Sequence, residues 1–378
     1  MKIQDIDTYV VAVTPGINWV FLRVRTDAGV HGWGECTLEG KDLSVLAAVE
    51  ELSRSLRGQE VPSPSAAWHR FNSTAAWKGA ALYSAMSGID HALWDIAGKV
   101  AGLSVSRMLG GPVRDRLHLY TWAGSLEDPA FLRDQIDEAR ERYGYTHFKI
   151  APVDTYFTLD RQSLRAAIER VEVVASHLPD SGRIAIDCFG RLTVPAAVSL
   201  ANAVEGIPIA FLEDLVNTDD EAALRTLRNR TGATLAAGEK RYNRVHAWPL
   251  LRDNLIDYLL IDLCHAGGIT ESIRIAAVAE TVGVGVIPHN PNGPIGMAAT
   301  LHAAAVSPGV LAAESTHVRF ELMETISTQP MRIVDGYIPI PDGPGLGVEL
   351  DVDALLAHAG TPADFPFKGN GSAASGRI

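Results

Sequence analysis

The sequence has few cysteines and none of the common nucleotide-binding motifs. Three cysteines occur in 378 residues, with no CxxC and no paired spacing. This usage predicts a reduced, cytoplasmic protein without a zinc ribbon. Neither G-x-G-x-x-G nor GxxxxGK[ST] is present, which disfavours dinucleotides and nucleoside triphosphates as ligands.

Long apolar runs and excess positive charge are also missing. No run approaches the length of a membrane span, and the N-terminal MKIQDIDTYVVAVTPG has acidic residues where a signal peptide needs an apolar core. The 33 Lys and Arg against 45 Asp and Glu give a net charge of −12, which disfavours nucleic acid and anionic membranes as partners. An anionic substrate must therefore be attracted locally, by a metal ion or by individual Lys and Arg residues.

Three acidic residues follow apolar runs at equal intervals. IAID ends at Asp187, AFLE at Glu213 and TLAAGE at Glu239, and both intervals are 26 residues. This repeat fits one strand, one helix and two short loops. Parallel strands would bring the three carboxylates to one end of the sheet, where they would repel one another unless a cation lay between them. An all-oxygen site of this charge suits Mg²⁺.

The same strand–helix alternation extends over most of the chain. Its regularity predicts a closed parallel barrel over 116–322, preceded by a small α+β domain over 1–115. The segment 323–378 contains the strand-like stretch MRIVDGYIPIPDGPGLGVELD, and we expect it to pack on the N-terminal domain. The predicted strand ends carry Lys149, Asp187, Glu213, Glu239, Asp262, His289 and Glu314.

The remaining strand-end residues predict the reaction chemistry. Asp262 ends the strand next to that of His289, and a carboxylate that holds one imidazole nitrogen makes a His a base near neutral pH. Lys149 would contact a substrate anion, and Glu314 could donate to an enediolate oxygen. Together these groups suit removal of the proton next to a metal-held carboxylate.

Motifs along nearly the whole chain resemble the enolase superfamily, in its mandelate racemase branch. They are SGIDHALWDIAGK, DCFGR, FLED in place of FxEEP, AAGEKRYNR, DLCHAGGITE, PHNPNGPIG and IPDGPGLGVEL. The likeness is greatest to acid-sugar dehydratases of the galactonate dehydratase type. It implies a (β/α)₇β barrel with a capping domain, Mg²⁺ on Asp187, Glu213 and Glu239, and a catalytic His289–Asp262 dyad. It also implies a hydro-lyase that converts a sugar acid to a 2-keto-3-deoxy acid.

Two positions depart from the pattern of that branch. Racemases carry K-x-K on the second strand, whereas Lys149 is followed by Ile150 and Ala151, so the second base of a racemase is missing. Galactonate dehydratase-like members place a His two residues after the first metal ligand, and Phe189 stands there. The leaving hydroxide must then be protonated by another group, or the substrate differs. The alternatives are His289 in a syn elimination, Lys149, Tyr156 or Arg191.

The resemblance also implies a specificity loop in the capping domain and a symmetric homo-oligomer. We expect residues 15–19 to form that loop, with Asn18 and Trp19 contacting the substrate beside Lys149 and Arg191. Other functions remain open. They are an epimerase or cycloisomerase acting on a hydroxy acid or sugar lactone, a Schiff-base aldolase using Lys149, and a sugar-acid-binding relative that kept the metal.

Overall fold

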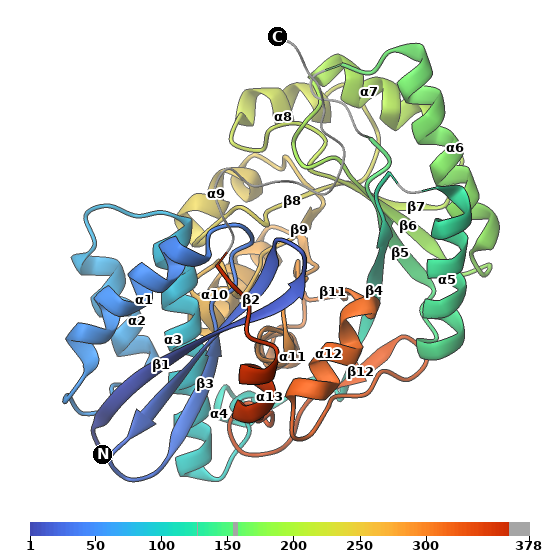
Figure 1. Cartoon of the computed structure of the whole chain (residues 1–378). Helices are drawn as coiled ribbons and strands as arrows, with labels where there is room; N and C mark the ends of the chain where they lie inside the picture. Colours follow the sequence, from blue (N-terminus) through green and yellow to red (C-terminus); the bar gives the residue numbers. More distant parts are fainter. Residues whose placement is uncertain (127, 154–157, 363–378) are drawn as a thin grey trace.

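A three-stranded antiparallel sheet and three helices open the chain. The computed structural model describes residues 1–126, 128–153 and 158–362, and we call residues 1–101 the cap. The strands lie in the order β1-β2-β3, and the helices cover one face of the sheet (Figure 1). The cap elements are β1 (Ile3–Thr14), β2 (Ile17–Thr26), β3 (His31–Glu35), α1 (Asp42–Leu56), α2 (Pro64–Thr74) and α3 (Ala80–Ala101).

The central strand of the cap is apolar on both faces because both faces are covered. Val20, Leu22 and Val24 of β2 belong to the core beneath the cap helices. The alternate residues Trp19 and Phe21 belong to the core that continues into the rest of the molecule. Successive strand side chains point to opposite faces, so β2 joins the two cores.

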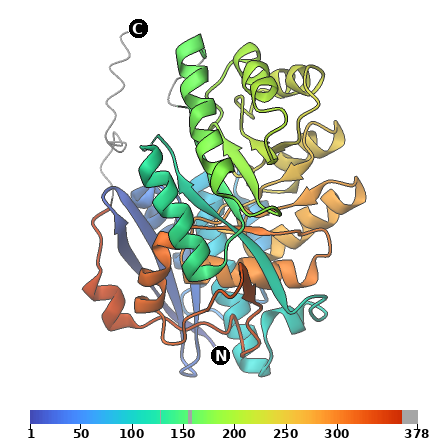
Figure 2. The same cartoon turned by 90° about the vertical axis from the view of Figure 1, so that its right-hand side faces the viewer.

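Helix and strand then alternate through a parallel barrel. Its strands are β4 (Arg116–Gly124), β5 (His147–Ile150), β6 (Arg183–Asp187), β7 (Ile209–Glu213), β8 (Leu235–Ala237), β9 (Tyr258–Leu259), β10 (Gly285–Val286) and β11 (Ala313–Ser315). The helices between them are α5 (Pro129–Tyr143), α6 (Arg161–His177), α7 (Val194–Ala203), α8 (Glu221–Arg228), α9 (Arg244–Arg252), α10 (Gly268–Thr281) and α11 (Pro294–Val306). Figure 2 shows α5 and α6 on the outside of these strands.

Hydrogen bonds between the first and last strands close this sheet. Neighbouring strands follow chain order from β4 to β10, and β11 pairs with β4 in parallel. On its other side, the chain leading into β11 meets β10. The backbone N–H of Val286 donates to the carbonyl of Gly309 at 2.9 Å, and the Leu311 N–H donates to the carbonyl of Val286 at 2.9 Å. The closed (β/α)₇β barrel predicted from the sequence is therefore confirmed.

The sequence sets helix boundaries in the barrel by familiar signals. The Asp128 carboxylate accepts a hydrogen bond from the Ala130 N–H at 2.7 Å, Pro129 occupies the first turn, and Gly144 ends α5 with φ 74°. An N-cap carboxylate satisfies an otherwise unpaired N–H, and glycine tolerates positive φ at a C-cap. Gly144 thus ends the helix three residues before β5 begins at His147.

The end of the described chain returns to the cap. The Ala12 N–H of β1 donates to the His358 carbonyl at 2.9 Å, and the Gly360 N–H donates to the Val10 carbonyl at 2.8 Å, as expected for the C-terminal segment. Within the described residues, no helix has the length and apolar character needed to cross a membrane. The remaining elements are α4 (Val105–Met108), η1 (His317–Arg319), α12 (Phe320–Ile326), β12 (Tyr337–Pro339) and α13 (Val352–Ala357).

Candidate active site

Adjacent strands bring three carboxylates together at the mouth of the barrel. Asp187 ends β6, Glu213 ends β7, and the two residues are register partners. Glu239 follows β8 by two residues. One oxygen of each carboxylate lies within 4.8 Å of the others. The three carboxylates therefore lie together, as expected from their equal spacing in the sequence. We call these residues the acidic triad.

The Lys149 ammonium lies against the acidic triad. Its Nζ is 3.5 Å from Asp187 Oδ2, 3.0 Å from Glu213 Oε2 and 3.0 Å from Glu314 Oε2. Only 2% of the Lys149 side chain is exposed. Burial alone would lower the pKa of Lys149, but the surrounding carboxylates raise it well above its ordinary value. Lys149 is therefore a fixed cation at the centre of the mouth.

The ammonium groups of Lys149 and Lys240 do not balance the negative charge around them. Buried Asp187 Oδ2 and Glu213 Oε2 accept no hydrogen bond, although both face Lys149. Burial, together with Glu239 and Asp214, raises the pKa of Asp187 to about 7 against the opposing effect of Lys149. Oxygen-only donors with unsatisfied charge fit a hard divalent cation. The acidic triad could hold such an ion.

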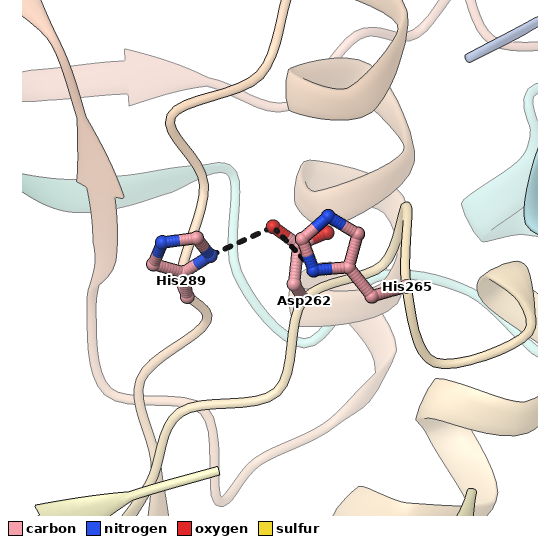
Figure 3. Close-up of side chains that lie close together, drawn as sticks. All are labelled: Asp262, His265 and His289. Carbon is pink, nitrogen blue, oxygen red and sulfur yellow. Dashed lines mark hydrogen bonds and ion pairs between the residues drawn. The ribbon is translucent and has the colours of Figure 1, made fainter. Parts of the chain in front are cut away.

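The predicted dyad lies next to the acidic triad. His289 Nδ1 is 2.8 Å from Asp262 Oδ2 (Figure 3), and Asn292 Nδ2 donates to the same oxygen at 2.9 Å. His289 Nε2 lies 3.3 Å from Glu239 Oε2. Burial lowers the pKa of His289, but Glu239, Glu314 and Asp262 outweigh it and raise the pKa to about 10. The structure thus brings a titratable imidazole to the edge of the acidic triad.

Glu314 contacts the same Lys149 ammonium as Asp187 and Glu213. It belongs to β11, which pairs with β4. The Tyr120 hydroxyl donates to Glu314 Oε2 at 3.5 Å, and the Lys149 ammonium donates to the same oxygen at 3.0 Å. All seven of the predicted strand-end side chains therefore lie at one end of the barrel.

His265 joins the dyad but was not singled out from the sequence. Its Nε2 lies 3.0 Å from the Thr37 carbonyl oxygen of the cap, and its Nδ1 lies 3.8 Å from Asp262 Oδ2. Asp262, His265 and His289 form a second group that could hold a metal ion (Figure 3). The short spacing in the sequence could have indicated this contact, because His265 follows Asp262 by only three residues in DLCH, which is less than one helical turn.

Two buried cap carboxylates also hold barrel elements. Glu35 accepts hydrogen bonds from the Gly293 N–H and the Gly296 N–H, both at 2.7 Å. Asp90 accepts from the Thr270 N–H at 3.0 Å. Carboxylates at these positions satisfy N–H groups at the starts of α11 and α10. Both carboxylates therefore cap barrel helices from the cap, at separations in the sequence that no local motif marks.

No proton donor occupies position 189. Phe189 has φ 53°, and its N–H donates to Asp187 Oδ1 at 2.8 Å. The Arg191 guanidinium carbon lies 4.7 Å from the centroid of the Phe189 ring, a cation–π contact. Tyr156, another candidate acid, and the segment 363–378 lie outside the described residues.

Residues 17–19 form part of a strand, so the expectation of a loop over 15–19 is wrong there. Pro15 and Gly16 make a tight turn, and β2 begins at Ile17. Asn18 Nδ2 donates to Asp42 Oδ2 at 2.6 Å, and the Trp19 Nε1–H donates to the Pro291 carbonyl at 3.4 Å. Both side chains are buried, Trp19 completely, because apolar β2 is covered on both faces. Contact of Asn18 and Trp19 with substrate stays a prediction.

Comparison with known proteins places this geometry in a family. Residues 10–110 match the mandelate racemase/muconate lactonizing enzyme N-terminal domain, and residues 132–354 match the enolase C-terminal domain-like family. The chain is 36% identical over 373 residues to a D-galactonate dehydratase of Xanthomonas oryzae pv. oryzae, covering 97% of this chain and 96% of that protein. A D-galactonate dehydratase of Verminephrobacter eiseniae is 36% identical over 369 residues, covering 95% and 94%.

Solved structures share the architecture. An enolase from Agrobacterium radiobacter, proposed to be a galactarate dehydratase and bound to Na and L-malate, superposes with a TM-score of 0.86 at 28% identity over 95% of each chain. A proposed dehydratase from Mesorhizobium loti superposes with a TM-score of 0.89 at 24% identity, covering 96% of this chain and 99% of that one. The chain therefore belongs to the enolase superfamily, in its mandelate racemase branch, and is a hydro-lyase.

Proposed function

We propose that the protein is a Mg²⁺-dependent acid-sugar dehydratase that converts a sugar acid to a 2-keto-3-deoxy acid. One observation carries the proposal. His289 Nε2, the nitrogen that Asp262 leaves available, lies 3.3 Å from Glu239 of the acidic triad. A base in this position is next to the place where a cation would hold a substrate carboxylate. The 36% identity to D-galactonate dehydratases supports the substrate class.

Asp187, Glu213 and Glu239 are the proposed ligands of Mg²⁺. When bound there, Mg²⁺ would hold the substrate carboxylate and stabilise the negative charge that develops on it as the α-proton leaves. The unbalanced charge of these buried carboxylates supports this assignment. The L-malate bound to the Agrobacterium radiobacter enolase supports a small carboxylate as substrate.

His289 is the proposed general base. The carboxylates around His289 favour its protonated ring, and Mg²⁺ bound to Glu239 would offset part of that negative charge and favour the neutral ring. In the neutral ring Asp262 accepts the Nδ1 proton, which leaves the lone pair on Nε2 to remove the α-proton. Asp262 is itself held by the Cys264 N–H at 2.6 Å and by Asn292 at 2.9 Å. These contacts fix the carboxylate, and the carboxylate fixes the imidazole.

Lys149 and Glu314 are proposed to bind the reacting end of the substrate. The buried Lys149 ammonium supplies a fixed positive charge for a substrate oxygen. Glu314, hydrogen-bonded by Lys149 and Tyr120, lies where it can contact an enediolate oxygen. Arg191, half-buried beside Phe189, is the proposed contact for the distal hydroxyl groups.

The leaving hydroxide is proposed to take its proton from His289 in a syn elimination. Phe189 cannot donate a proton, and the Lys149 ammonium is held among carboxylates. His289 removes the α-proton through Nε2 and then returns a proton to the β-hydroxyl on the same face of the substrate. The C–H and C–O bonds break, water leaves, and the enol product tautomerises to the keto acid.

The test is a panel of aldonic and aldaric acids incubated with the Mg²⁺-loaded protein. A semicarbazide-reactive keto acid from at least one substrate is the expected result. In D₂O, His289→Asn should abolish both product formation and exchange of the α-proton. Exchange without loss of water would identify an epimerase or cycloisomerase instead, and no turnover of any panel member would contradict the proposal.

A further inference from the structure

A second set of possible metal ligands lies beside the acidic triad and has a different chemistry. Asp262, His265 and His289 point toward one another from the chain segments after β9 and β10 (Figure 3). One ligand atom of each residue lies within 4.8 Å of the others. Two imidazole nitrogens and one carboxylate oxygen contrast with the three carboxylates of the acidic triad.

The hydrogen bond to the cap determines which nitrogen of His265 is protonated. His265 Nε2 is 3.0 Å from the Thr37 carbonyl oxygen, and a carbonyl can only accept, so Nε2 carries the proton. In the neutral ring, Nδ1 then has a lone pair. This nitrogen faces Asp262 Oδ2 at 3.8 Å, too far for a hydrogen bond. Two acceptors thus face each other across a gap that a cation can bridge.

His289 supplies the third ligand atom. Its Nδ1 is 2.8 Å from the same Asp262 oxygen. The proton on this nitrogen can move to Nε2 or leave to solvent, which frees the Nδ1 lone pair for a metal. About 15% of each imidazole side chain is exposed, 14% for His265 and 15% for His289. Both imidazoles are therefore partly accessible to solvent.

We propose that Asp262, His265 and His289 form a second metal site, selective for a borderline divalent cation such as Zn²⁺. Imidazole ligands favour Zn²⁺, Cu²⁺ and Ni²⁺ over Mg²⁺. Two nitrogens and one oxygen provide three ligands of a tetrahedral zinc site, at about 2.0–2.2 Å, and leave the fourth position for water. The acidic triad, with oxygens alone, retains its preference for the harder ion.

Occupancy of this second site would inhibit the enzyme, a consequence that rests on the proposed function. With Nδ1 of His289 bonded to the metal, the imidazole loses its hydrogen bond to Asp262. If the displaced proton moves to Nε2, no lone pair remains to accept the α-proton. If it leaves to solvent, the adjacent metal charge makes Nε2 a weaker base. Zn²⁺ is therefore an inhibitor that does not compete with Mg²⁺.

Zinc binding to the Mg²⁺-saturated protein tests the site without any substrate. Calorimetric titration with Zn²⁺ should show one additional ion per chain, and zinc K-edge absorption should show two imidazole nitrogens. His265→Gln, which keeps an N–H for Thr37, should weaken binding at least about tenfold. His69→Gln, a change at an exposed histidine on α2, should leave binding unchanged.

The alternative is that Zn²⁺ merely replaces Mg²⁺ on the acidic triad. In that case excess Mg²⁺ would displace it, Asp187→Asn would remove it and His265→Gln would not. That pattern, or an absorption spectrum without imidazole ligands, overturns the proposal. A protein that binds Zn²⁺ as described but dehydrates no sugar acid would contradict the proposed function alone.

Discussion

The two halves of the barrel mouth are built in different ways. Asp187, Glu213 and Glu239 contact barrel residues in the described part of the chain, chiefly the ammonium groups of Lys149 and Lys240. The half that carries the base is also bonded to the cap. There His265 meets the Thr37 carbonyl, and Glu35 holds the start of α11 just beyond His289.

This difference separates metal binding from proton transfer. A site built from adjacent strand ends forms as soon as the barrel forms. A base whose flanking loop is held from another part of the chain also depends on how the cap is docked. Substitutions in the cap should therefore lower turnover more than they lower the affinity for metal. Substitutions in the acidic triad should lower the affinity for metal more.

Loss of the base should have the largest effect. His289→Asn replaces the imidazole with an amide, which cannot act as a base near neutral pH, and should lower turnover by at least about 10²–10⁴-fold, the usual contribution of a general base. Binding of Mg²⁺ and of an unreactive sugar acid should persist, as measured by calorimetry. Loss of metal binding in this variant would show that the two halves are not separable.

Neutralising one member of the acidic triad should remove the metal response. Asp187→Asn keeps an oxygen for the Phe189 N–H but removes one negative charge from a crowded group. The thermal stability of the wild type should rise with Mg²⁺, because an ion that binds only the folded state stabilises that state by mass action. The variant should be more stable than wild type without metal and insensitive to Mg²⁺. Equal Mg²⁺ responses in thermal melts of the two proteins would count against the assigned ligands.

The cap contacts should be distinguishable by a matched pair of substitutions. Both Glu35 oxygens accept backbone hydrogen bonds, so Glu35→Gln turns an amide NH₂ toward an N–H and should cost about 1–3 kcal/mol of stability. Because those contacts hold the loop after His289, turnover should fall roughly tenfold, or 1.4 kcal/mol in the barrier, with Mg²⁺ affinity unchanged.

Asp90→Asn is the control for that experiment. Asp90 is also a buried cap carboxylate at the start of a barrel helix, but only its Oδ2 accepts the Thr270 N–H, and its Oδ1 has no hydrogen-bond partner. The NH₂ group of Asn can therefore take the place of Oδ1 without facing another N–H. Its stability loss should be smaller and its turnover close to wild type. If both variants lose turnover equally at the same residual stability, the cap does not position the base.

A smaller effect should appear in the pH dependence of stability. Burial raises the pKa of Glu35 to about 7, against the opposing effect of its hydrogen bonds from Gly293, Gly296 and Thr37. The folded state then binds more protons than the unfolded state between about pH 4.5 and 7, so this contribution is complete below about 4.5 and is lost as the pH rises through 7. Denaturant unfolding across this range should give a flatter profile for Glu35→Gln, and an unchanged slope would contradict it.

Local patterns in the sequence predict the acidic half of the mouth well. The carboxylates follow apolar runs of similar length, and parallel strands bring such positions to one edge of the barrel. Strand lengths are predicted less well, since β9 and β10 each contain only two residues and Asp262 and His289 lie three residues beyond them. The apolar runs continue beyond the residues that form strand hydrogen bonds, so the sequence does not mark where each strand ends.

The contacts that hold the base could not be read from the sequence. Glu35 lies 258 residues before Gly293, and Thr37 lies 228 residues before His265, so no local spacing relates them. Trp19 illustrates the converse problem. An aromatic residue near a turn fits a binding loop and a strand core equally well, and the structure places it in the core between β2 and the barrel.

The proposed reaction depends on a divalent cation among Asp187, Glu213 and Glu239, beside His289. Diffraction from crystals soaked in Mn²⁺, an anomalous scatterer that can replace Mg²⁺, tests it most directly. We expect one anomalous peak about 2.0–2.3 Å from an oxygen of each carboxylate. A Mn²⁺-soaked crystal with no peak there, and with the Lys149 ammonium alone among the three carboxylates, would contradict it.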